Sequence, residues 1–109
     1  MSATTETVLR NHLQAARVGV DAVMQDYTGD AVLITHDASY RGAAEIRGFF
    51  TAFLDGVPGT FFDAFKMQRQ EVAGEVGYIL WEAKPWIARA TDTFVVRNGK
   101  IVLQTFTAA

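Results

Sequence analysis

The stretch from residue 91 to residue 106, TDTFVVRNGKIVLQTF, constrains the fold of this chain more than any other. Two apolar runs flank Asn98-Gly99, and both residues of this dipeptide tolerate the positive φ that a type I′ turn requires. The pattern therefore predicts a long antiparallel hairpin, in which the strand before the turn pairs with the strand after it. Such a hairpin provides a sheet against which the other segments can pack.

The composition indicates one globular domain over residues 1–109. Half of the residues are hydrophobic, and eight Phe, three Tyr and two Trp supply a sizeable core or a cavity, which excludes a disordered chain. The formal net charge is −2 and the Lys and Arg residues are scattered, so nucleic acid is not an expected partner. No residue is a cysteine, which excludes disulfides and thiolate metal sites.

The N-terminal sequence MSATTETVLRNH lacks the charged and apolar regions of a signal peptide. No apolar run approaches the roughly 20 residues that are needed to span a bilayer. We therefore expect a cytoplasmic protein that does not interact with membranes.

A helix and then a second, short helix are predicted at the start of the chain. The Thr4-Thr5 pair can cap the first helix, in which apolar residues recur at spacings of three and four. Gly19 interrupts this pattern, and Asp21 can cap a second helix over residues 22–27.

The remaining segments predict strands around one longer helix. Residues 28–30 read as a turn before a β-branched strand at 31–35, and residues 40–42 as a loop or a second short strand. Helical periodicity returns at Ala43 and stops at Pro58-Gly59. The period then becomes two, which predicts four strands at residues 60–73, 76–84, 86–97 and 100–107. Helices segregated from a mainly antiparallel sheet make an α+β domain.

One long run, AARVGVDAVMQDYTGDAVLITHDASYRGAAEIRGFF, followed by DTFVVRNGKIV, carries several short motifs together. A Gly-containing break separates two helices, a Tyr-x-x-Asp-Ala step enters the first strand, an Arg-Gly pair precedes an amphipathic helix, and a Gly-Lys-Ile hairpin closes the sheet. These motifs lie at residues 19–21, 27–31, 41–42 and 99–101. The combination resembles the nuclear transport factor 2-like superfamily, and within it the SnoaL-like and ketosteroid-isomerase-like proteins.

The resemblance implies a cone-shaped, curved mixed β-sheet wrapped by N-terminal helices, the architecture called cystatin-like or nuclear transport factor 2-like. It also implies a pocket inside the cone and a homodimer formed through the outer face of the sheet. A separate observation agrees with the homodimer, because Val95 stands beside Val96 and Ile79 beside Leu80. A sheet that is covered on one side only alternates more cleanly than this.

Asp92 is the first candidate catalytic residue. By the resemblance it matches the acid that ketosteroid isomerases use as an oxyanion-hole donor. Burial beside Phe94 and the tryptophans would raise the pKa of its carboxyl group, and the protonated form could donate a hydrogen bond to a carbonyl oxygen. The alternative is that Asp92 ends a strand in solvent or pairs with Arg89 or Arg97.

His12 is the second candidate, because it lies on the apolar stripe of the first helix. The resemblance matches it to a helix position where those isomerases carry a catalytic tyrosine. A histidine there could donate a proton or a hydrogen bond near pH 7. The alternative is a core histidine that is satisfied by one local acceptor.

Asp37 is the third candidate. The resemblance puts a general base at Thr35, which cannot act as one, and this departure argues against steroid isomerisation itself. Asp37 follows two residues later on the same strand face, from which it could reach the mouth of the pocket. The alternative is an ordinary polar loop residue.

Two further chemistries have weaker support. Epoxide hydrolases of this fold use an Arg and an Asp together, but Arg89 and Asp92 are three residues apart and would face opposite sides of a regular strand. His12 and His36, with Asp37 or Asp92, lack a metal-ligand spacing such as His-x-x-x-His. We therefore expect neither a metal nor another cofactor.

The aromatic residues could line a pocket or fill a packed core. The residues predicted to contact a ligand are Tyr27, Thr35, Phe49, Phe53, Trp81, Trp86 and Phe94. The sequence thus predicts a SnoaL-like protein that binds a hydrophobic or polycyclic small molecule, with isomerase or cyclase chemistry by proton transfer next to a carbonyl. The alternative is a non-catalytic ligand-binding or dimerisation module, and the sequence leaves open whether the protein is an enzyme.

Overall fold

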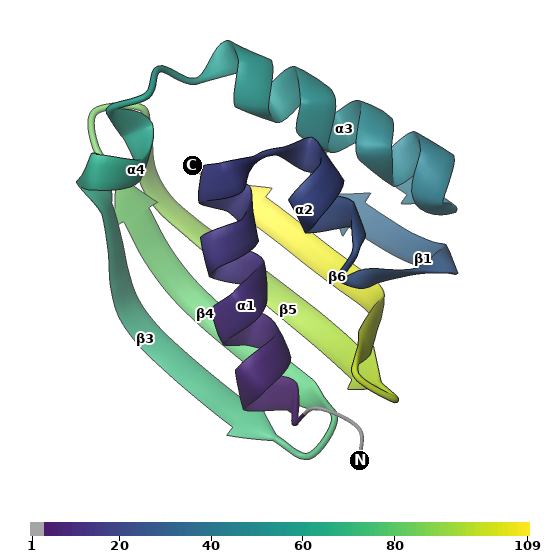
Figure 1. The fold of residues 1–109 in the computed structure, drawn as a ribbon. Coiled ribbons are helices and arrows are strands. Elements are labelled where there is room, and N and C mark those ends of the chain that lie inside the picture. Colours follow the sequence, from purple (N-terminus) through teal and green to yellow (C-terminus); the bar gives the residue numbers. More distant parts are fainter. Residues whose placement is uncertain (1–3) are drawn as a thin grey trace.

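The computed structural model describes residues 4–109, in which a six-stranded sheet curves around packed helices (Figure 1). The strands are β1 (Tyr27–Thr35), β2 (Ser39–Arg41), β3 (Phe65–Ala73), β4 (Val76–Ala83), β5 (Ile87–Arg97) and β6 (Lys100–Ala108). Their order across the sheet is β2-β1-β6-β5-β4-β3. The β1–β6 pair is parallel and the other pairs are antiparallel, so the predicted mixed sheet of an α+β fold is confirmed.

The helices are α1 (Thr5–Val18), α2 (Val20–Met24), α3 (Ala43–Gly56) and α4 (Phe61–Ala64). α1 begins where predicted, because the Thr4 hydroxyl accepts a hydrogen bond from the backbone N–H of Thr7 at 3.1 Å. α1 crosses the concave face of the sheet in front of β4 and β5, and α3 lies above β1 (Figure 1). The helices therefore close one side of the curved sheet.

The hairpin between β5 and β6 is confirmed. Asn98 has φ 51° and Gly99 has φ 78°, the positive values that a type I′ turn requires. Beyond the turn the strands pair from Arg97 with Lys100 to Ala90 with Ala108, with one irregularity beside Val96. This register determines which side chains of the two strands face the concave side.

Three predicted boundaries differ from the structure. Residues 61–64 were predicted to lie in a strand, because the sequence alternates with a period of two from residue 60 onward. They form α4 instead, and this single helical turn buries Phe61. Residues 28–30, predicted as a turn, lie within β1, whose pairing with β6 shifts register between Tyr27 and Val32. α2 begins at Val20, so Asp21 lies in its first turn instead of capping it.

α1 packs closely on the sheet where it meets β4. Gly77 is buried beneath Leu9, and a Cβ at position 77 would lie 2.7 Å from Leu9 Cδ2 and 3.3 Å from Thr5 Cγ2. Glycine therefore allows α1 to approach the sheet backbone. Further along α1, the layers separate and leave space between helix and sheet.

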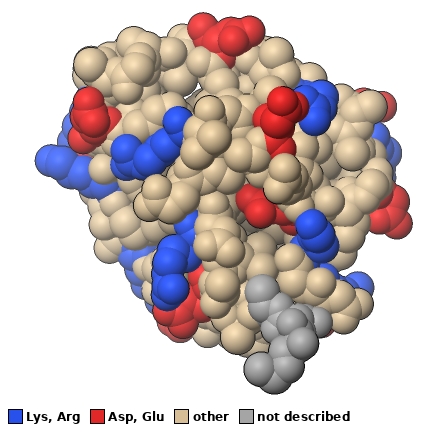
Figure 2. Space-filling model, in the orientation of Figure 1, with Lys and Arg blue, Asp and Glu red and all other residues tan. Residues whose placement is uncertain are grey.

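The exterior carries mixed charge. On the face drawn in Figure 2, basic and acidic side chains are interspersed over an otherwise neutral surface, and no broad patch has a single sign. Within residues 4–109, no helix is both long and apolar enough to cross a membrane.

Candidate functional site

A cavity of about 280 Å³ lies between the helices and the concave face of the sheet. All eight phenylalanines of the chain line it, although they come from α3, α4, β3, β5 and β6. The lining residues are Phe49, Phe50, Phe53, Phe61, Phe62, Phe65, Phe94, Phe106, Trp81, Met67, Ile79, Leu13, Ala16, His12, Gln14, Arg17, Asp92 and Gln104. The wall is thus mainly aromatic, with few polar groups.

Asp92 is the buried acidic group of this wall, with 6% of its surface exposed. Trp81 donates from Nε1 to Asp92 Oδ1 at 2.8 Å, and Gln104 donates from Nε2 to Asp92 Oδ2 at 2.8 Å. Both donors lie on strands next to β5, because β4 and β6 flank it. Each carboxyl oxygen therefore accepts one hydrogen bond from a neighbouring strand.

Burial raises the pKa of the Asp92 carboxyl group from an ordinary value of 3.8 to about 6, because the charged form loses its hydration. The hydrogen bonds from Trp81 and Gln104, and then the charge of His12, oppose this rise because they favour the carboxylate. Asp92 is therefore mainly ionised at pH 7, although it titrates much closer to neutrality than an exposed aspartate does.

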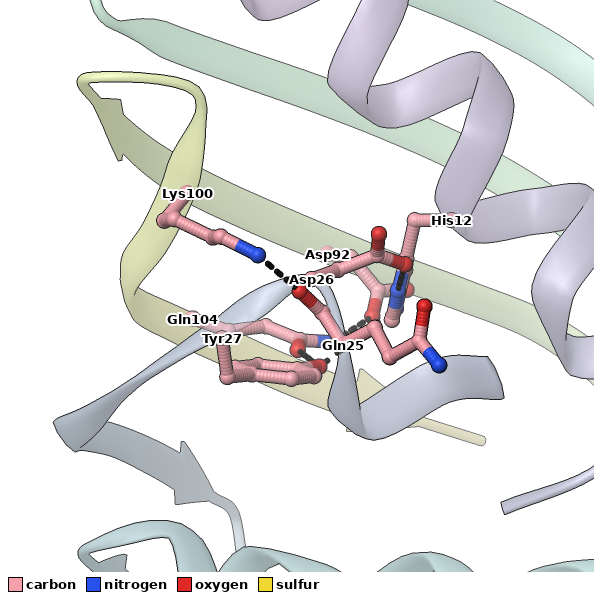
Figure 3. Close-up of polar contacts among 7 residues, drawn as sticks. All are labelled: His12, Gln25, Asp26, Tyr27, Asp92, Lys100 and Gln104. Atoms are coloured by element: carbon pink, nitrogen blue, oxygen red, sulfur yellow. Dashed lines mark hydrogen bonds and ion pairs between the residues drawn. The ribbon is translucent and has the colours of Figure 1, made fainter. Parts of the chain in front are cut away.

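A chain of polar contacts continues from Asp92 toward α1 (Figure 3). The Tyr27 hydroxyl donates to Gln104 Oε1 and lies 3.4 Å from His12 Nε2. His12 Nδ1 lies 3.0 Å from Asp26 Oδ2. Burial raises the pKa of Tyr27 above its ordinary value, and the charges of Asp92 and Asp26 raise it further. Tyr27 is therefore a neutral phenol that connects the histidine to the amide.

The structure brings most of the sequence-predicted site residues together. His12, Asp92 and four predicted ligand contacts line the cavity, the four being Phe49, Phe53, Trp81 and Phe94. Tyr27 lies behind the wall and reaches the site through Gln104.

Three other predicted residues are not part of the cavity wall. Asp37 is exposed and lies 3.3 Å from His36, measured from Asp37 Oδ2 to the histidine Nε2. Thr35 accepts hydrogen bonds from the backbone N–H groups of Asp37 and Ala38, which forms the turn after β1. Trp86 is 44% exposed and packs against Phe61 from outside the cavity.

Gln104 and Asp26 are the polar residues that the sequence reasoning missed. Counting along a regular hairpin from Asn98-Gly99 pairs Gln104 with Thr93, on the face opposite to Asp92. The irregularity between Val95 and Val96 shifts the pairing by one residue, so that Gln104 pairs with Phe94 and reaches the cavity. Asp26 also gave no signal, because its contact with His12 depends on the bend between α2 and β1.

Two other predicted chemistries can be compared with the geometry. Arg89 is exposed whereas Asp92 is buried in the wall, as expected for residues on opposite faces of β5. In the part of the chain from residue 4 onward, no group of three or more His, Cys, Asp or Glu residues could hold a metal ion.

Comparisons with solved structures agree with this architecture. No protein-family model matches the chain, and no curated protein matches it significantly in sequence. A nuclear transport factor 2-like protein of unknown function from Burkholderia xenovorans superposes with a TM-score of 0.76 and 20% identity, covering 96% of this chain and 82% of that one. A SnoaL-like protein of unknown function from Burkholderia thailandensis gives 0.80 and 13%, covering 96% and 94%. A proposed polyketide cyclase from Sinorhizobium meliloti gives 0.75 and 15%, covering 92% and 93%.

The chain has the nuclear transport factor 2-like fold. Identities of 20% or less establish the fold and carry no information about the reaction. The predicted resemblance to nuclear transport factor 2-like and SnoaL-like proteins is confirmed at this level.

Proposed function

We propose that this nuclear transport factor 2-like protein binds a small, mainly apolar molecule in its cavity, with Asp92 as the polar contact. The observation that supports the proposal is the gathering of all eight phenylalanines and Trp81 around about 280 Å³ of space beside one buried carboxyl group. Protein interiors are packed to the density of organic crystals and rarely leave such a space unfilled. An apolar pocket with a few polar groups is the usual form of a small-molecule site.

The volume of the cavity limits the size of the ligand. Ligand pockets commonly measure about 300–1,000 Å³, and the 280 Å³ of this cavity lies just below that range. The volume favours a molecule of one or two rings over the polycyclic substrate that the sequence had led us to expect.

A cavity-filling variant tests the binding proposal. Ala16 lines the cavity from α1, and Ala16→Phe would occupy part of the space. Ala44→Phe is the matched control, because Ala44 lies on α3 and does not line the cavity. Titration with indane, followed by ¹⁵N–¹H NMR, should shift the amides of the wall in the wild type and in Ala44→Phe but not in Ala16→Phe. Equal shifts in all three proteins would contradict the proposal.

Proton transfer beside a ligand carbonyl, as in an isomerase or a cyclase, is the second candidate function. It is favoured by the pKa of Asp92, about 6, because general bases work best when their pKa lies near the operating pH. The ionised carboxylate would take a proton from a carbon of the ligand, and His12 would supply polar contact from α1. A proposed polyketide cyclase among the structural neighbours is consistent with this reading. The proposal does not use Asp37, which is exposed outside the cavity wall.

Deuterium exchange tests proton transfer directly. We expect the wild-type protein in D₂O to accelerate exchange of the α-protons of 2-indanone, measured by ¹H NMR, and Asp92→Asn to abolish the acceleration. Asp55→Asn is the matched control on the exposed face of α3. Equal exchange with all three proteins would leave binding as the only supported function.

We also propose that two copies of the chain associate through the outer face of the sheet. Val95 pairs with Leu103 across β5 and β6, and Leu103 pairs with Val32 across β6 and β1. These apolar side chains alternate with the concave ones, and the outer face also carries Ile34, which is 41% exposed. A contiguous apolar surface of this kind commonly marks an interface.

Sedimentation equilibrium at micromolar concentration tests this association. We expect the wild type to sediment as a dimer and Val95→Lys as a monomer, because the charge would be desolvated at the centre of the interface. Thr51→Lys, on the exposed side of α3, should remain dimeric. A monomeric wild type would refute the proposal.

A further inference from the structure

We propose that the polar group of the ligand is a protonated amine, which Asp92 binds as a carboxylate among the aromatic rings of the cavity. This inference deepens the proposed binding function and rests on it, because it names the chemical class of the ligand. Three features of the site support it: the hydrogen-bond directions around Asp92, the balance of nearby charge and the chemistry of the wall.

Hydrogen-bond directions indicate that both oxygens of Asp92 accept. Trp81 Nε1 carries a hydrogen and can only donate, so Asp92 Oδ1 is an acceptor. The Tyr27 hydroxyl donates to Gln104 Oε1, which turns the amide nitrogen of Gln104 toward Asp92 Oδ2. This arrangement suits an ionised carboxylate, whose remaining lone pairs are free for a donor from the ligand.

Nearby charges leave this carboxylate without a direct cationic partner. Among the ion pairs of residues 4–109, none joins a Lys or Arg side chain to Asp92. The ionisable groups that face Asp92 are His12 from α1, Tyr27 from β1 and, behind them, Asp26. Arg17 also lines the cavity, but it is exposed and its guanidinium donates to the carbonyl oxygen of Phe62 at 3.1 Å.

The charge balance of this group favours a cation. Even when His12 carries a proton, its charge offsets only one of the two carboxylates, Asp26 and Asp92. Asp26 is the direct partner of His12, its side chain is 18% exposed, and Lys100 donates to the adjacent carbonyl oxygen of Gln25. The negative charge left without a direct partner is therefore that of the buried Asp92 carboxylate, and an unbalanced buried charge is costly. A ligand with one positive charge would balance it, whereas a ketone oxygen beside Asp92 would turn its lone pairs toward those of the carboxylate.

The wall suits the same ligand. Eight phenylalanines and Trp81 surround the space. Cations are attracted to the faces of aromatic rings, and the attraction is stronger at desolvated sites. The ring system of the ligand would pack against the same side chains. An amine that keeps at least one N–H is favoured over a quaternary ammonium, because the carboxylate lone pairs need a donor.

Three probes on one carbon skeleton test the inference: 2-aminoindane, 2-indanone and indane. Isothermal titration calorimetry at pH 7.5 should show that the amine binds the wild type at least tenfold more tightly than the ketone. Asp92→Asn should weaken amine binding at least tenfold and ketone binding less than threefold. Asp55→Asn, an exposed substitution of the same type, should leave all three affinities unchanged.

The wild type alone offers a second measurement, which does not depend on the folding of any variant. The pKa of Asp92 is about 6, whereas an alkylamine stays protonated throughout this range. Amine affinity should therefore fall about tenfold as the pH is lowered from 7 to 5, while indane affinity stays constant.

Several outcomes would overturn the inference. A ketone that binds as tightly as the amine, or an amine affinity that does not change between pH 7 and pH 5, would exclude the carboxylate–ammonium pair. In either case indane binding would leave the proposed cavity function standing. Failure of all three probes to bind would count against both proposals.

Discussion

Replacing Asp92 with asparagine should change how the stability of this protein depends on pH. Burial raises the pKa of Asp92 in the folded state from 3.8 to about 6. Between these values the folded protein binds the proton more tightly than the unfolded chain does. Asp92 therefore contributes stability that is fully present below about pH 3.8 and is lost as the pH rises through about 6.

The size of the effect follows from the two pKa values. A pKa difference of about two units, at about 1.4 kcal/mol per unit, corresponds to about 3 kcal/mol of unfolding free energy. Most of that change falls between pH 4 and pH 7. An amide does not titrate, so the Asp92→Asn variant should lack this component, although the amide fits the Trp81 and Gln104 donors less well.

Urea unfolding followed by tryptophan fluorescence at several pH values between 4 and 7 measures the effect. We expect the difference in unfolding free energy, wild type minus Asp92→Asn, to fall by about 2–3 kcal/mol as the pH rises across this range. Taking the difference cancels the other titrating groups, and Asp55→Asn should show no such slope. A difference that stays constant with pH would refute the burial argument for Asp92.

Three other substitutions test separate parts of the structure. Tyr27→Phe removes the hydroxyl shared by Gln104 and His12 and should cost about 1–3 kcal/mol of stability, measured by urea unfolding; an unchanged midpoint would contradict the polar chain. Gly77→Ala should lower the free energy of unfolding by about 1–3 kcal/mol, because the added Cβ crowds the buried face of helix α1. An unchanged free energy of unfolding would mean that the helix can shift to accommodate the added methyl group. Asn98→Ala should destabilise the fold by about 1 kcal/mol and lower the thermal midpoint of unfolding, because alanine tolerates the positive φ at this position less well. Asn98→Gly should not lower the midpoint, and equal midpoints for the two variants would argue against the positive φ.

Local signals were sufficient for much of the fold. The Asn98-Gly99 turn, the Thr4 cap and the helix that ends at Gly56 all depend on conformational preferences of residues close together in the chain. The errors arose where long-range packing overrides such preferences. Phe61 lies in a helical turn because the core holds its ring. Residues 28–30 lie within β1 because Tyr27 before them and Val32 after them both pair with β6, which carries the strand across this irregular stretch.

The site residues likewise divide into those that local sequence patterns predict and those that depend on long-range packing. Strand alternation was enough to predict that Asp92 and Phe94 share one face of their strand, but it left open whether that face points into a pocket or into solvent. In the structure both line the cavity together with Trp81. The same alternation did not reach Gln104, because a regular hairpin would pair it with Thr93, and only the irregularity beside Val96 pairs it with Phe94. The contact between His12 and Asp26 was not predictable, because it depends on how the chain bends between α2 and β1.

By itself, the sequence determined the turn at Asn98-Gly99 and the approximate positions of most strands, because turn chemistry and strand alternation act over a few residues. Tertiary structure alone decided that eight phenylalanines from distant segments surround one space. It also decided that the carboxyl group of Asp92 meets two N–H donors there and, within residues 4–109, no Lys or Arg side chain. The reason is physical. The net charge and the free volume at a site depend on every segment that the curvature of the sheet brings together. A pattern within a few residues of sequence carries no information about segments that are distant in the chain.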